Sequence, residues 1–154
     1  MRTLLTSLVL LSLTSIAFGQ SPAKFVGDGT DWGQIPFSRQ HGYVEGVHDG
    51  IFMGMMMFMQ SGDGDCGPGH AKKSDMTRYY CAISEIYYRI PSGLDSSKVT
   101  DEVSRFYADP RNVPVRWEAA VVISEAMLSG TKVTDEDLDT IRSYDAKATA
   151  SLKQ

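Results

Sequence analysis

Hydrophobic positions recur at three- and four-residue intervals along most of this chain, which is the spacing of amphipathic helices. A proline-free segment carries the pattern longest, and four shorter segments repeat it. We expect helices over residues 38–59, 75–88, 95–108, 114–129 and 134–150. No alternating run is long enough to predict a sheet. The expected fold class is all-α, a small helical bundle of about four to five helices with one disulfide.

Several helix ends are marked by residues with known end preferences. Asp95 is a suitable N-cap for the third helix, and Pro114 suits the first turn of the fourth. Gly130 is a natural C-terminal cap, and Thr134 with the acidic residues after it opens the last helix. These signals predict four boundaries independently of the hydrophobic spacing.

The first long helix carries a glycine at every fourth position. These glycines are Gly42, Gly46, Gly50 and Gly54. They share one helical face and form a smooth stripe that another backbone can approach closely. Each one weakens the helix by about 1 kcal/mol relative to alanine.

The N-terminus has the pattern of a secretory signal peptide. Arg2 supplies a positive start, residues 4–17 are apolar apart from Ser and Thr, and residues 17–19 fit a cleavage site. We therefore expect a signal peptide over 1–19, an irregular lead-in over 20–37 and one helical domain over 38–150. The mature protein is expected to be periplasmic or secreted, with no stable membrane insertion after cleavage.

Composition limits the possible classes of protein. The chain has 154 residues, 42% hydrophobic and 22% charged, with a net charge of -4. This composition is too apolar for a disordered chain, and the only long uncharged apolar run lies at the N-terminus. No basic stripe is present, so we expect no nucleic-acid partner.

The two cysteines, Cys66 and Cys81, are 15 residues apart. In an oxidising compartment they most simply form one structural disulfide. A metal pair or a reactive thiol is the alternative, but no second cysteine pair and no Cys-x-x-Cys spacing accompanies them. The predicted disulfide joins the glycine-rich loop of residues 60–74 to the second helix.

Three sequence features are compatible with a metal. His41, Glu45 and His48 fall on one helical face, and residues 63–65 resemble the opening of a calcium loop. Thioethers are soft ligands for cuprous copper. The clustered methionines are Met53, Met55, Met56, Met57 and Met59. A solvated helix face and a methionine-rich core or partner surface explain these features without metal, so we expect no cofactor.

No catalytic constellation is evident, and we expect a non-enzymatic protein. The chain lacks a Gly-x-Ser-x-Gly elbow, its cysteines are expected to be oxidised, and its acids are scattered on helix surfaces. Exposed-type aromatics favour an interaction protein, although they would also cap a core. These aromatics are Tyr79, Tyr80, Tyr87 and Tyr88. The candidate partner-binding residues are Asp63, Asp65 and His70 in the loop, with Arg111 and Arg116 in the 108–116 connection.

An ordered set of short motifs resembles the Rap/Tai-type immunity domain family. Residues 43–50 read Tyr-Val-Glu-Gly-Val-His-Asp-Gly, and residues 90–94 read Ile-Pro-Ser-Gly-Leu. Asp-Pro-Arg follows at 109–111, and an Ala-Ala-Val-Val helix at 119–122 closes the unit. The resemblance covers roughly residues 40–130.

That resemblance implies a periplasmic helical protein that inhibits a peptidoglycan amidase delivered by type VI secretion. The implied partner is a cell-wall amidase effector, blocked sterically without chemistry by the inhibitor. A homodimer is possible on the same resemblance. Two alternatives remain: a periplasmic stress or acid-response chaperone that exposes apolar surface on acidification, and a methionine-based copper binder.

Overall fold

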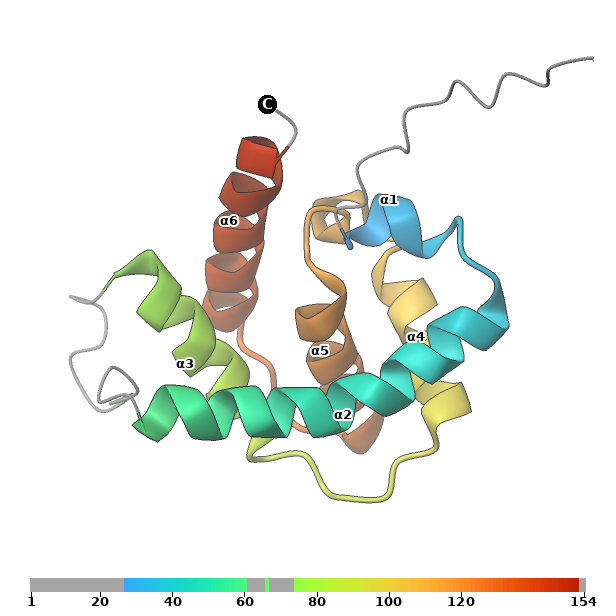
Figure 1. The fold of residues 1–154 in the computed structure, drawn as a ribbon, viewed down its shortest axis with the longest axis horizontal. Helices are drawn as coiled ribbons and strands as arrows, with labels where there is room; N and C mark the ends of the chain where they lie inside the picture. Colours follow the sequence, from blue (N-terminus) through green and yellow to red (C-terminus); the bar gives the residue numbers. More distant parts are fainter. Residues whose placement is uncertain (1–26, 61–65, 67–73, 153–154) are drawn as a thin grey trace, which may run out of the picture.

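The computed structural model is all-helical, as the hydrophobic spacing predicts. It describes residues 27–60, 66 and 74–152, with the backbone alone at positions 48, 49, 52, 53, 55–60 and 152. No strand occurs in these ranges. Six α-helices and one 3₁₀ turn follow one another (Figure 1): α1 (Gly29–Trp32), α2 (Phe37–Gln60), α3 (Asp75–Tyr87), α4 (Ser96–Phe106), η2 (Pro110–Asn112), α5 (Trp117–Ser129) and α6 (Asp135–Leu152).

Side-chain caps mark several helix starts, and a glycine ends α5. Asp95 accepts a hydrogen bond from the backbone N–H of Ser97 at 2.9 Å, which confirms it as the N-cap of α4. Thr134 and Asp137 cap each other's backbone N–H at the start of α6, each at 3.1 Å. Gly130 ends α5 with φ of 72°, a left-handed conformation that favours glycine. These three predicted boundaries are confirmed.

The start of α5 differs from the sequence prediction. Pro114 was expected in its first turn, but the helix begins at Trp117 with Arg116 as N-cap. Residues before it belong to a tight turn, in which the backbone N–H of Val115 bonds to the carbonyl of Asn112 at 2.9 Å. The side chain of Val115 is fully buried there. Burying this valine fixes the turn and delays the helix by one turn.

Helix α5 forms the centre of the core. Residues 119–126 are all buried, and α5 packs against α4, α3 and α2 while α6 packs against α3. Figure 1 shows α5 standing between α6 and α4, with α2 crossing in front. The remaining helices contribute apolar faces to the same core. Its largest fully buried side chains include Tyr79, Ile86, Val99, Val103, Ile123 and Ile141.

The predicted irregular lead-in contains the short helix α1, which is packed into the core. Trp32 is buried, and its indole N–H donates to Ser104 Oγ at 3.1 Å. The indole N–H of Trp117 donates to the backbone carbonyl of Asp28 at 2.6 Å. Glycine and aspartate content suggested a loop, whereas Trp32 supplies enough buried surface to hold a helical turn. Phe37, by contrast, is exposed.

Substituting Gly29 with alanine should destabilise the fold by about 1–3 kcal/mol, because the added Cβ would overlap the Tyr107 ring. That ring cannot move freely, since its hydroxyl donates to the Val115 carbonyl at 2.8 Å. Gly33→Ala is the matched control, since a Cβ there meets no atom within 4 Å. Urea unfolding of the two variants measures the difference. Equal stabilities would contradict the packing of α1.

Candidate binding groove

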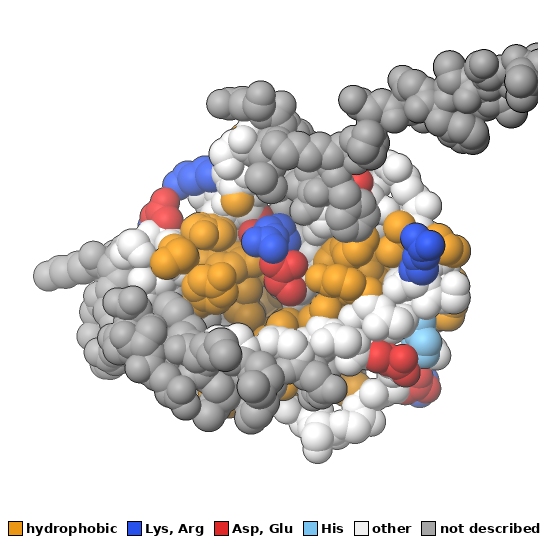
Figure 2. Space-filling model, viewed as in Figure 1, with side chains coloured by type: hydrophobic (Ala, Val, Ile, Leu, Met, Phe, Trp, Pro, Cys, Tyr) orange, Lys and Arg blue, Asp and Glu red, His pale blue; other side chains and the backbone are white. Residues whose placement is uncertain are grey.

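An apolar groove of about 480 Å³ opens between α2 and α3. Its walls are helix side chains and exposed helix backbone, and one carboxylate stands among the described lining residues. The lining residues are Gly42, Tyr43, Gly46, Val47, Gly50, Ile51, Gly54, Tyr79, Tyr80, Ile83 and Glu118. Figure 2 shows hydrophobic side chains on this face of the molecule, on both sides of a neighbouring basic and acidic group. The volume lies within the range of small-molecule binding sites.

The glycine stripe of α2 forms one wall of this groove. All four glycines are solvent-exposed, and apart from its own helix backbone and chain neighbours, a Cβ built on any of them would meet no described atom within 4 Å. The sequence predicts that another backbone can approach this stripe closely. Within the described part of the chain, no element occupies that position. The packing of the described residues therefore does not explain why four helix-weakening glycines share one face.

The opposite wall comes from α3 and combines buried with exposed aromatic groups. Of the two roles considered for Tyr79, a partner surface or a cap on the core, the structure shows the second: it is 2% exposed, and its ring stacks on Tyr144 at a centroid distance of 4.4 Å. Burial raises the pKa of Tyr79 well above its usual value. Tyr80 and Met76 remain 37% and 48% exposed, four residues apart on the same face. This wall therefore extends the apolar groove outward to solvent.

A charged pair lies at the α5 end of the groove. Arg116 Nη2 and Glu118 Oε1 are 2.6 Å apart, and both side chains are partly buried. Burial and the Glu118 charge raise the pKa of Tyr43 to about 12, so this lining residue is neutral. The groove thus offers a mostly apolar surface with one ion pair at its edge.

Asp145 of α6 is buried directly behind this pair. Its Oδ2 accepts hydrogen bonds from the backbone N–H of Arg116 at 3.0 Å and from the Tyr79 hydroxyl at 3.5 Å. Burial raises the pKa of Asp145 to about 7, and the Arg116 N–H bond only partly offsets it. Because this pKa exceeds that of the unfolded chain, ionised Asp145 weakens the fold above pH 7. The penalty fades as the pH falls from 7 toward 4.

The structure separates the predicted partner-binding residues. Arg116 lies beside the groove because its guanidinium pairs with Glu118, which is a lining residue. Arg111 lies in η2, away from the groove lining, and its guanidinium binds the Asp109 carboxylate at 2.6 Å. Those bonds lower the pKa of Asp109 to about 2. Asp63, Asp65 and His70 lie outside the described residues.

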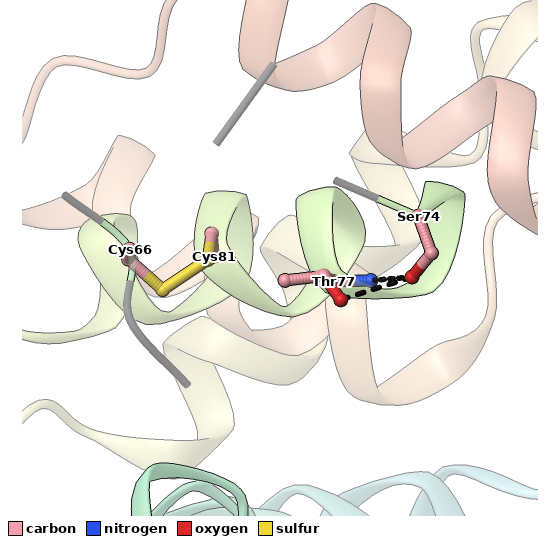
Figure 3. Close-up of a disulfide and its surroundings, with 4 residues drawn as sticks. All are labelled: Cys66, Ser74, Thr77 and Cys81. Carbon is pink, nitrogen blue, oxygen red and sulfur yellow. Dashed lines mark hydrogen bonds between the residues drawn. A yellow bond between two sulfur atoms is a disulfide. The ribbon is translucent and has the colours of Figure 1, made fainter. Parts of the chain in front are cut away.

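The disulfide prediction is confirmed. Cys66 and Cys81 are bonded, with their Cα atoms 5.3 Å apart. Figure 3 shows the bond between Cys66 and Cys81 of α3. At the start of the same helix, the Ser74 hydroxyl accepts a hydrogen bond from the Thr77 backbone N–H at 3.2 Å. Cys81 is fully buried and next in sequence to Tyr80 of the groove. The disulfide therefore joins Cys66 to the helix that forms one groove wall.

The candidate metal positions are only partly described. His41 Nε2 lies 3.5 Å from Glu45 Oε1, while the His48 side chain and the methionine cluster fall outside the description. In the part of the chain that the structure covers, no three or more His, Cys, Asp or Glu side chains are grouped as metal ligands. No helix there is long and apolar enough to cross a membrane.

Comparison with known proteins gives no relative for this chain. No family model, no curated protein and no solved structure matches it. The groove itself was not predicted from the sequence. The four-residue glycine spacing was its signal, but spacing alone does not tell whether a glycine face is covered or open.

Proposed function

We propose that this chain is an exported, non-enzymatic protein-binding module whose binding surface is the α2–α3 groove. The observation that supports this most is the open glycine stripe. Four glycines cost about 2–4 kcal/mol of helix stability, yet alanine would fit at each position against the described residues. A partner that approaches the α2 backbone closely provides a reason to keep them.

The partner we propose is a cell-wall amidase effector, as the resemblance to the Rap/Tai-type family implies. Inhibition would be steric, because the groove edge and its exposed aromatic side chains would cover the amidase cleft and exclude peptidoglycan. Tyr80 and Met76 provide exposed apolar surface of the kind that dominates protein interfaces. An acid-unfolding chaperone is less well supported, because protonation of Asp145 favours the folded state.

Filling the groove should abolish binding. Gly46→Trp places a large ring in open space on the exposed glycine face, so the fold should tolerate it while a partner should not. We expect at least a tenfold loss of affinity for a purified type VI amidase, with matching loss of inhibition in a peptidoglycan hydrolysis assay. Binding would be measured by biolayer interferometry on residues 20–154.

The matched control is Ala146→Trp, which adds the same ring at an exposed α6 position outside the groove. It should bind as the unaltered chain does. Equal affinity of both variants for the amidase would contradict the groove as the binding surface. Failure of the unaltered chain to bind or inhibit any amidase in a panel from related strains would contradict the immunity function.

A further inference from the structure

We propose that occupation of the α2–α3 groove is coupled to uptake of one proton by Asp145. This inference rests on the proposed function, because it assigns a regulation to the same groove. Asp145 does not line the groove but lies one residue behind its wall. The partner would therefore bind more tightly as the pH falls, without touching the carboxyl group itself.

Few hydrogen-bond donors reach the Asp145 carboxyl group, and this shortage favours its protonated form. Its side chain is 0% exposed, and an ionised carboxylate accepts about four hydrogen bonds when fully satisfied. Both observed donors, Arg116 N–H and the Tyr79 hydroxyl, approach Oδ2. Oδ1 is buried and has no hydrogen-bond partner among the described residues. An ionised carboxylate is thus under-solvated here, and protonation relieves that cost.

Both donors to Asp145 belong to the groove structure. Tyr79 is a lining residue of the α3 wall. Arg116 is the N-cap of α5, and its guanidinium pairs with Glu118, the only carboxylate among the described lining residues. A single layer of side chains therefore separates Asp145 from the water in the groove, so displacing that water changes the environment of the carboxyl group.

The charges facing Asp145 favour proton uptake. Tyr79 and Tyr80 face it from α3, Arg116 and Glu118 from α5, and Tyr107 from the end of α4. The pKa values of all three tyrosines are raised, so these phenols are neutral near pH 7. With Asp145 ionised, two carboxylates share one guanidinium. The cluster then carries one excess negative charge, which protonation removes.

Covering the groove should strengthen this preference. A partner that displaces water beside Tyr79 and Glu118 lowers the local polarity, and lower polarity disfavours the charged carboxylate. The pKa of Asp145, about 7 in the open groove, would rise further on binding. By linkage, a ligand that raises this pKa binds more tightly at lower pH. A rise of about one pH unit corresponds to about fivefold tighter binding at pH 6 than at pH 8.

The coupling can be measured with a neutral apolar fluorophore, N-phenyl-1-naphthylamine, whose own charge does not change between pH 6 and pH 8. Its Kd for residues 20–154 should be about fivefold lower at pH 6. Asp145→Asn should bind the fluorophore with the same Kd at both pH values. Asp139→Asn, an exposed α6 control, should keep the pH dependence. Gly46→Trp should remove binding, which places the fluorophore in the groove.

Carboxyl ¹³C NMR of the unaltered chain provides a readout that does not depend on the folding of a variant. The titration midpoint of Asp145 should move to higher pH when the fluorophore saturates the groove. Binding with equal Kd at pH 6 and pH 8, an unmoved midpoint, or pH dependence that survives in Asp145→Asn would overturn the coupling alone. Absence of fluorophore binding at every pH would overturn the groove as an apolar docking site as well.

Discussion

Replacing Gly42, Gly46, Gly50 and Gly54 together with alanine should raise the free energy of unfolding by about 2–4 kcal/mol. Each substitution reduces the backbone entropy of the unfolded chain and adds a methyl group that meets no atom within 4 Å. The melting temperature should increase by about 10 °C. Urea denaturation and calorimetry would measure both quantities.

The same four substitutions should weaken partner binding, and this combination is what makes them informative. A partner backbone that packs against glycine cannot approach as closely once four methyl groups stand on the α2 face. A gain in stability together with a loss of affinity would identify the glycines as a surface kept for binding at the expense of the fold. Such an exchange is common where a binding surface and helix propensity make different demands on the same residues.

Gly130→Ala is the control for this set. Its φ of 72° disfavours any residue with a Cβ, so this substitution should lower stability. The contrast separates an open helical glycine from one that the backbone requires. If the quadruple variant is instead less stable than the unaltered chain, the glycine face packs against part of this chain and is not available to a partner.

The sequence predicts the helices well because hydrophobic spacing and capping residues agree for most of them. The apolar run at 119–123 and the caps at Asp95 and Gly130 each act locally, within one or two helical turns. Pro114 misleads because its preference for a first helical turn is weaker than the burial of Val115 beside it. Local preference is overridden where tertiary packing supplies more free energy.

The candidate site is less accessible to sequence reasoning, because it depends on long-range placement. Asp145 is an ordinary polar position in the sequence, but the structure buries it against Tyr79, 66 residues earlier, and Arg116, 29 residues earlier. The lead-in helix α1 similarly depends on the hydrogen bond from Trp32 to Ser104, 72 residues away. Periodicity within one helix carries no information about which face of another helix it will meet.

Removing the disulfide should destabilise the fold by about 3 kcal/mol and weaken binding in the groove. Cys66 and Cys81 are 15 residues apart, and a loop of this size gives that value in the chain-entropy model. The comparison uses the unaltered chain with the bond intact and reduced, so that both samples contain the same side chains. Calorimetry under matched buffer conditions measures the difference, and Cys66→Ala with Cys81→Ala provides the second test.

The effect on binding follows from the reach of the chain. From Gln60 at the end of α2 to Cys66 is six residues, which span at most about 21 Å. Without the bond, the chain constraint between the two helices is the fifteen-residue separation of Gln60 from Asp75 at the start of α3, a reach of about 50 Å. The disulfide therefore limits how far the end of α2 can move from the middle of α3, and these two helices form the groove walls. Reduction should raise the Kd for N-phenyl-1-naphthylamine several-fold. An unchanged Kd would show that packing on α5 alone keeps α2 and α3 at a fixed distance.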